Sequence, residues 1–316
     1  MNNAPPEISA PRRSKLYPLA RLWSLTWERL LLAIPYAWMV MFFLIPFLIV
    51  LKISLADSAL ARPPFTPLLT WIDAQHLSLT ITIGNYEYLW QSSLYIRAYL
   101  NSLMIASIST VLCLLIGYPM AFAIARARTQ WRNIMLLMVM LPFWTPFLLR
   151  VYAWTGLLDQ NGLINRFLEW SHVISSPLTM LYTPFAVYLG IIYSYLPFMV
   201  LPLYATLERL DATLDDAASD LGARPASVFF DITLPLSIPG IIAGSLLVFI
   251  PAVGEFVIPD LLGNDSNVMI GRVLYDEFFS NRDWPTASAV AIALLVALVV
   301  PIILFQYYQG KQLESS

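Results

Sequence analysis

The amino-acid sequence predicts an all-α integral membrane protein with six transmembrane helices and a folded cytoplasmic loop. Of its 316 residues, 59% are hydrophobic and 12% are charged, and the mean hydropathy is +0.68. A soluble globule of this length needs more polar surface than such a composition supplies. Runs long enough to cross a bilayer recur at 30–53, 99–125, 134–157, 181–207, 237–258 and 285–308. We therefore expect one transmembrane domain over 30–308 and no second large domain.

Positively charged residues set the expected orientation. They cluster before the first apolar run and between the second and third runs, at Arg12, Arg13, Lys15, Arg21, Arg29, Arg126, Arg128 and Arg132. Cytoplasmic segments of membrane proteins are enriched in lysine and arginine, so both clusters are expected in the cytoplasm. Six spans then return the tail, 309–316, to the same side. Residues 1–29 show no signal-peptide pattern, and part of this segment suits a helix lying along the inner membrane surface.

The first apolar run leads into a long loop over 54–98, which parity places outside. Within it Leu77–Ile83 alternates between apolar and polar residues, which is typical of a short strand. We expect a small extracytoplasmic cap that either meets a soluble partner or serves as a structural linker. The outer loops at 159–180 and 260–284 carry aromatic and charged residues, which fits a docking surface or an aromatic belt.

Every predicted span contains proline. A proline within a helix removes one backbone hydrogen bond, and other helices or cavity water must then satisfy the freed carbonyl. The pattern favours bent helices in a protein that moves, although transmembrane helices of all kinds are rich in proline.

A polar loop over 208–236, between the fourth and fifth apolar runs, has the pattern of a small helical hairpin. Thr213 and Asp216 have the spacing of a capping box, which predicts the start of a helix. Gly222 is placed to end that helix, and Pro225 to open a second one.

The hairpin carries small residues that suit a docking surface. Ala217 and Ala218 leave one helix face nearly flat, so another protein can approach the backbone closely. Asp216 is expected to anchor the first turn. A merely solvated loop helix explains the capping pattern, but not the later Ile232-x-Leu234-Pro235.

The sequence carries no pattern of a catalytic or metal site. His76 and His172 are the only histidines and lie far apart, and Cys113 is the only cysteine. Gly310-Lys311 lacks the other residues of a phosphate-binding loop, so any ATP hydrolysis must reside on a partner chain. We expect no enzymatic activity, no metal and no cofactor on this chain, and the net charge of −2 gives no indication of nucleic acid.

Glu255 is the clearest ionisable residue within a predicted span. A charge at bilayer depth costs about 2.5–3.5 kcal/mol and seldom persists without a use. A helix that begins near Ser237 places Glu255 close to its outer end, so we interpret it as an outer-gate or vestibule residue. The alternatives are a carboxylate that caps a re-entrant turn, or one that forms an ion pair with Arg150.

Aromatic residues flank Arg150 in the third predicted span. Trp144, Tyr152 and Trp154 offer ring faces that hold an ammonium group, and Asp260 adds a carboxylate beside Glu255. Together these five residues are the candidate substrate pathway, for which a cationic substrate is the best match. Packing or an aromatic belt is the alternative for the rings.

The loop pattern Asp216-Ala217-Ala218, Gly222 and Ile232-x-Leu234-Pro235 resembles the coupling loop of the permease subunits of bacterial ABC importers. Asp216 stands where that family usually has glutamate, which keeps the charge on a shorter side chain. From about Leu30 onward the chain is similar to the permease of a polyamine importer of the putrescine/spermidine type. The stretches that carry this likeness are Leu44–Val50, Gly117–Pro119, Leu149–Trp154, Pro197–Pro202, Pro251–Pro259 and Asn281–Pro285.

This resemblance implies a type I ABC importer permease fold in the bacterial inner membrane, with both termini in the cytoplasm. The implied partners are a second homologous permease subunit, two ATPase subunits and a periplasmic polyamine-binding protein. Movement of the ATPases would be transmitted through 213–235. Asp216, Ala217, Ala218 and Gly222 would lie in the ATPase cleft, and Ile232, Leu234 and Pro235 would fix the return into the fifth helix.

Two alternatives remain open from sequence. The first alternative is an ABC importer permease with another substrate, because related permeases for ferric iron, sulfate or phosphonates share the coupling loop. The other is a channel or carrier that works without ATP, which predicts ionisable residues near mid-span and no ordered cytoplasmic hairpin.

Overall fold

The computed structural model describes residues 32–73, 76–264 and 268–314, and the chain divides into two compact units, Met1–Lys52 and Ile53–Ser316. The described residues of the first unit belong to the apolar helix Leu32–Ser54. A π-helical segment, η1 (Val40–Leu44), precedes α2 (Ile45–Ser54). It forms because Pro46 cannot donate a backbone hydrogen bond to the preceding turn. The segment 1–29, predicted as an interfacial helix, lies outside the described residues.

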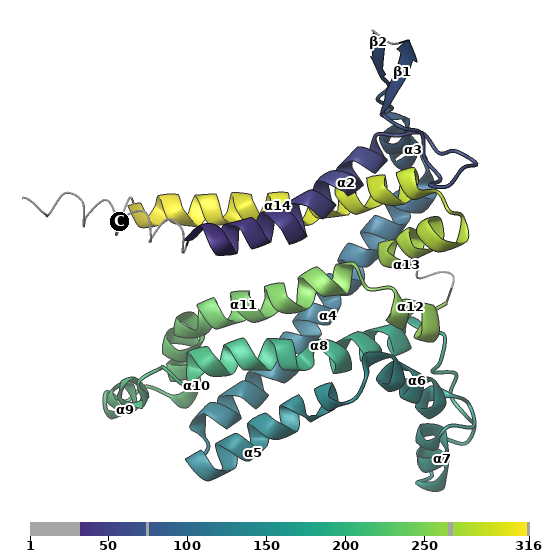
Figure 1. Cartoon of the computed structure of the whole chain (residues 1–316). Helices are drawn as coiled ribbons and strands as arrows, with labels where there is room; N and C mark the ends of the chain where they lie inside the picture. Colours follow the sequence, from purple (N-terminus) through teal and green to yellow (C-terminus); the bar gives the residue numbers. More distant parts are fainter. Residues whose placement is uncertain (1–31, 74–75, 265–267, 315–316) are drawn as a thin grey trace, which may run out of the picture. The chain divides into compact units, whose positions relative to one another are not determined.

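Three long helices form the centre of the second unit. These are α4 (Ser93–Arg126), α8 (Pro184–Leu207) and α11 (Leu234–Val253), which pack side by side (Figure 1). Gly244 on α11 allows a close approach, because a Cβ there would lie 2.9 Å from Sδ of Met199 on α8. Cys113 is buried in this core.

The third predicted span is not one straight helix. The structure has α5 (Thr129–Met140), the 3₁₀ turn η2 (Leu141–Trp144) and α6 (Phe147–Leu158), followed by α7 (Leu163–Trp170). The two halves, Thr129–Trp144 and Phe147–Trp170, meet at 89°. The run 134–157 therefore forms a bent pair of helices, and a span there stays a prediction. Pro146 explains the break, because it lacks an N–H and holds Thr145 in an extended conformation.

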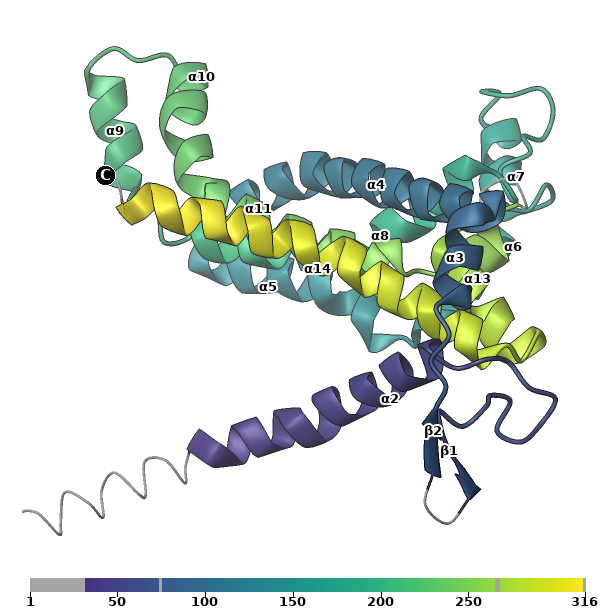
Figure 2. The ribbon, with the colours of Figure 1, turned by 90° about the horizontal axis from the view of Figure 1, so that it is seen from above.

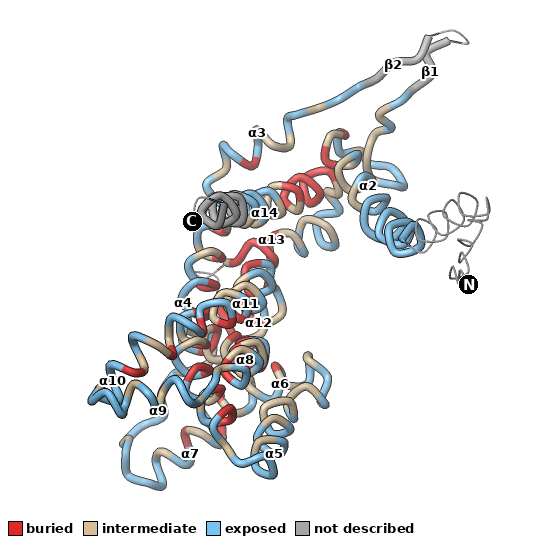
Figure 3. The backbone as a smooth tube through the Cα atoms, turned by 90° about the vertical axis from the view of Figure 1, so that its left-hand side faces the viewer, coloured by how far each residue is buried: buried red, intermediate tan, exposed pale blue. Residues whose placement is uncertain are grey.

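Shorter elements follow α11. They are α12 (Val257–Leu262), α13 (Ile270–Tyr275), the π-turn η5 (Asp276–Ser280) and the final helix α14 (Trp284–Glu314). Buried residues gather where α4, α8, α11 and α12 meet and in the first turns of α14 (Figure 3). Within the described ranges four helices are long and apolar enough to cross a membrane, or five if the bent pair counts as one span. A sixth span at 285–308 stays a prediction, since the part of α14 identified as apolar is the shorter stretch Trp284–Val300.

The loop 54–98, predicted to lie outside, contains a β-hairpin and a helix. Strands β1 (Leu69–Asp73) and β2 (His76–Leu79) pair in antiparallel register, with Leu69 opposite Leu79. The predicted strand over Leu77–Ile83 thus ends early, and α3 (Gly84–Gln91) follows and packs against α14. This loop is therefore a folded segment, as the predicted cap requires.

Candidate functional site

A helical hairpin projects at one end of α4, α8 and α11, while α6, α7 and α12 gather at the other end (Figures 1 and 2). It consists of α9 (Ala212–Asp220), a turn at Gly222, and α10 (Pro225–Val228). We call it the α9–α10 hairpin. The hairpin lies within the predicted loop 208–236, so the sequence placed it correctly.

Asp211 caps the N-terminus of α9. Its Oδ1 accepts a hydrogen bond of 3.0 Å from the backbone N–H of Thr213. That bond lowers the pKa of the exposed Asp211 carboxyl below its ordinary value. The predicted capping by Thr213 is therefore wrong. The helix begins two residues before the position that a Thr213 cap requires, because Asp211 is the residue that keeps the extended backbone of an N-cap.

Gly222 ends α9 as predicted. Its φ of 84° lies in the left-handed region, and its N–H donates to the carbonyl of Ser219 at 2.9 Å. A Cβ built at Gly222 would meet no atom within 4 Å, so the requirement for glycine comes from backbone conformation and not from crowding. Pro225 then opens α10 at its first position, also as predicted.

The second arm of the hairpin runs without a break into a long helix. A π-turn, η3 (Phe229–Thr233), joins α10 to α11, and together they form Pro225–Val253. Pro235 lacks the N–H that the preceding turn would use, which accounts for the wider turn. Ile232, Leu234 and Pro235 therefore sit within one continuous helix, with Leu234 packed against the core around Cys113.

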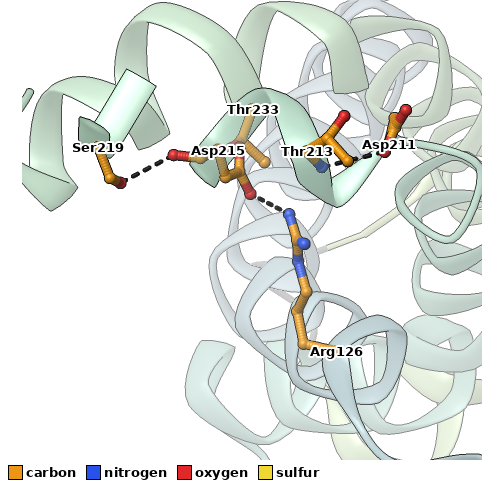
Figure 4. Close-up of polar contacts among 6 residues, drawn as sticks. All are labelled: Arg126, Asp211, Thr213, Asp215, Ser219 and Thr233. Atoms are coloured by element: carbon orange, nitrogen blue, oxygen red, sulfur yellow. Dashed lines mark hydrogen bonds and ion pairs between the residues drawn. The ribbon is translucent and has the colours of Figure 1, made fainter. Parts of the chain in front are cut away.

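Asp215 joins α9 to its neighbours (Figure 4). Its Oδ2 forms an ion pair with Nη2 of Arg126, the last residue of α4, and its Oδ1 accepts a hydrogen bond of 3.4 Å from Thr233. Asp216, the predicted anchor, has a side chain outside the described set, so that role stays a prediction. Ala217 is exposed and Ala218 is half-buried. Sequence reasoning missed Asp215, because its partners lie 89 and 18 residues away.

Arg132 forms a second ion pair near the hairpin. Its Nη1 lies 2.6 Å from Oε1 of Glu208, the C-cap of α8, and its Nη2 donates to the carbonyl of Ala125 at 3.1 Å. Arg132 lies in the first turns of α5. The connection between α4 and α5 is thus tied to the segment that leads into the hairpin.

A pocket of about 480 Å³ opens where the middle of α8 faces the end of α11. Glu255 lines it and is only 7% exposed. Its Oε2 accepts a hydrogen bond of 2.5 Å from the hydroxyl of Tyr195, and its Oε1 accepts from the backbone N–H groups of Phe256 at 3.1 Å and Val257 at 3.0 Å. Glu255 therefore caps the turn into α12, one of the two alternatives considered for it.

Arg150 lines the same pocket but does not pair with Glu255 in the described part of the chain. Its guanidinium carbon lies 5.1 Å from the ring centre of Phe143 and 5.7 Å from that of Phe147. Its Nε and Nη1 are buried and have no hydrogen-bond partner among the described residues. Aromatic faces hold this cation in place of a carboxylate.

The other predicted pathway residues do not line this pocket. Trp144 is 72% exposed and Tyr152 is also exposed. Trp154 packs edge-on against Tyr193 with ring centres 5.3 Å apart, and Asp260 pairs with Arg272 at 3.3 Å. Residues that sequence reasoning missed supply the lining beside Glu255: Phe143, Ser194, Tyr195, Phe198 and Phe256. Three of them lie on α8, while Phe143 lies in η2 and Phe256 precedes α12, so only the tertiary fold brings them together.

Comparison with known proteins identifies a matching family and similar transport proteins. Residues 113–313 match the family model "Binding-protein-dependent transport system inner membrane component". The spermidine/putrescine transport system permease protein PotB of Haemophilus influenzae is 40% identical over 286 residues, covering 90% of this chain and 94% of that protein. Its namesake in Escherichia coli is 39% identical over 276 residues, covering 87% and 94% respectively.

A solved structure shares the fold. It is a bacterial alginate ABC transporter in complex with an alginate pentasaccharide-bound periplasmic protein. One of its chains superposes with a TM-score of 0.68 at 19% identity, covering 95% of this chain and 98% of that chain. The chain therefore shares its helical fold with a chain of that transporter.

Proposed function

We propose, since this chain belongs to the family of binding-protein-dependent transport system inner membrane components, that it is a permease subunit of an ATP-driven polyamine importer. The observation that carries the substrate class is the likeness to two permeases named for spermidine and putrescine, each of which it matches over most of both chains. Family membership alone does not select a substrate.

In this proposal the chain forms part of the substrate pathway and transmits movement across the membrane domain. ATP hydrolysis occurs on partner ATPase subunits. The α9–α10 hairpin enters the ATPase cleft with Asp216, Ala217, Ala218 and Gly222. Ala217 and Gly222 are small and exposed, which supports this role because they let a partner approach the backbone. Ile232, Leu234 and Pro235 pass the movement into α11, since no break separates α10 from α11.

The pocket around Glu255 is the proposed outer part of the substrate pathway. A polyamine carries ammonium groups, which carboxylates and aromatic faces bind. Glu255 supplies the carboxylate, and Phe198 and Phe256 supply the faces, since the Phe143 ring already holds Arg150. The roles predicted for Trp144, Tyr152, Trp154 and Asp260 would belong to other parts of the pathway.

The rest of the importer comes from other chains. A second permease subunit would complete the central pathway, two ATPase subunits would bind the hairpins, and a periplasmic binding protein would deliver the polyamine. The membrane is the bacterial inner membrane, with both termini on the cytoplasmic side. Alternate opening to each side then follows from ATP-driven movement of the two permeases.

Uptake in cells tests the substrate class. Cells without their own polyamine import would express this chain with its partner subunits, and labelled spermidine uptake would be measured. Unlabelled putrescine or spermidine should suppress the signal, and sulfate or iron should not. Sulfate or iron uptake without polyamine uptake would assign the same machine to another substrate.

A further inference from the structure

Two ion pairs connect the α9–α10 hairpin region to the turn between α4 and α5. Arg126 at the end of α4 pairs with Asp215 on α9, and Arg132 on α5 pairs with Glu208 at the end of α8. We call this set the two-arginine latch. Each arginine has a further contact that fixes its direction. Arg126 lies over the Phe122 ring at 5.5 Å, and Arg132 donates to the carbonyl of Ala125.

We propose that the two-arginine latch passes movement of the α9–α10 hairpin to α4 and α5, so that its four residues are positioning residues for transport. This inference rests on the proposed function, because it presumes that a partner moves the hairpin. The continuous helix α10–α11 is one route for that movement, and the latch is a second.

Helix α9 has little apolar anchoring of its own. None of its described side chains is buried. Its described links to the bundle are therefore mainly polar, and Asp215 contributes two of them, one to Arg126 and one to Thr233 (Figure 4). A displacement of α9 consequently acts directly on the end of α4.

The latch also has a path to the pocket. Helix α5 begins near Arg132, and the 3₁₀ turn at its other end supplies Phe143. Phe143 holds the guanidinium of Arg150 and lines the pocket with Glu255. A shift of α5 at the latch would therefore move the aromatic wall of the pocket, because a helix transmits displacement along its length.

The exposure of these ion pairs argues against a purely stabilising role. The side chains of Arg126 and Asp215 are 33% and 25% exposed, and those of Arg132 and Glu208 are 24% and 39% exposed. Pairs so accessible to water add little to folding stability. Breaking one is expected to leave the assembled transporter intact while its transport becomes less tightly coupled.

A charge-reversal cycle tests the proposal in reconstituted importer. The variants are Arg126→Asp, Asp215→Arg and the double swap. Arg128→Asp, the same reversal on an exposed arginine of the turn between α4 and α5, is the matched control. The readout is the number of ATP molecules hydrolysed per polyamine transported. Each single reversal should raise this ratio about tenfold, and the swap should return it to within about twofold of wild type. The latch would be overturned if both single variants hydrolysed as many ATP molecules per polyamine as wild type does. It would also be overturned if the swap gave a ratio as high as that of either single variant.

A second measurement does not depend on the transported solute. Leu221 is 90% exposed at the hairpin turn, so a spin label on Leu221→Cys reports hairpin mobility, and the native Cys113 is too buried to be labelled. Both single reversals should increase label mobility, and the swap should reverse the increase. Unchanged mobility in the single variants would contradict the latch. Absence of ATP-dependent polyamine uptake by the wild-type importer would instead contradict the proposed function.

Discussion

Gly222 turns the chain between α9 and α10 in a conformation that side chains disfavour. Replacement by a β-branched residue costs about 1–2 kcal/mol at such a φ. Gly222→Val is therefore expected to distort the hairpin and uncouple ATP hydrolysis from uptake, with membrane insertion unchanged. Gly222→Asn is the control, because asparagine tolerates this conformation, and it should transport almost normally. Normal coupled uptake by Gly222→Val would remove the hairpin from the coupling mechanism.

Glu255 accepts hydrogen bonds that a neutral amide can only partly replace. Its carboxylate receives backbone N–H groups at one oxygen and the Tyr195 hydroxyl at the other. Hydrogen bonds to charged groups contribute about 1.5–3 kcal/mol each. Glu255→Gln should lower polyamine uptake roughly tenfold while the complex still assembles. Glu169→Gln, the same change on an exposed side chain of α7, should have no effect. Equal uptake by both variants would return Glu255 to a purely structural role.

Local rules account for the site residues that sequence could predict. Gly222 and Pro225 obey helix-end preferences that are set by backbone geometry alone. Asp215 and Tyr195 were missed because their roles depend on Arg126 and Glu255, which only the tertiary fold brings close. Even the local prediction at Thr213 was wrong, since several acidic and hydroxyl residues compete for one N-cap.

At the scale of elements, the cap of α9 predicts a pH dependence. The pKa of Asp211 is lowered in the folded hairpin, so the cap stabilises α9 above the unfolded pKa and is lost as pH falls through the folded pKa. Hydrogen exchange over 211–222 should be faster in Asp211→Ala than in wild type at pH 7 and at pH 5. That difference should disappear well below about pH 3.9, the usual aspartate value.

Asp211→Asn provides the control for this experiment. Asparagine caps helices without a titrating group. The protection of 211–222 against exchange in Asp211→Asn should therefore show no loss of the cap as pH falls. Exchange in Asp211→Ala equal to that of wild type at pH 7 would show that the cap does not hold α9.

Element boundaries followed the apolar pattern except where proline intervened. The fourth span was predicted at 181–207 and is found at Pro184–Leu207. The third was predicted as one helix and is bent at Thr145-Pro146. Hydropathy cannot distinguish these cases, because Pro197 and Pro202 lie within α8 without breaking it. Whether a proline breaks a helix depends on the neighbours that satisfy the freed carbonyls.

At the scale of the whole molecule, composition and the coupling-loop pattern were sufficient to predict the fold class. Large apolar side chains remain exposed on the helices, among them Leu115 on α4 and Met138 on α5. Such surface is expected where lipid or another permease subunit covers it. The number of spans is not fixed in the same way, because it depends on how the bent pair and α14 are placed in a bilayer.

The most direct test of the account is uptake of labelled putrescine and spermidine into proteoliposomes that contain this chain and its partner subunits. ATP and the binding protein would each be supplied or withheld. We expect uptake only when both are present. Uptake without ATP would indicate a channel or carrier, and ATP turnover stimulated only by a binding protein loaded with another solute would contradict the polyamine assignment.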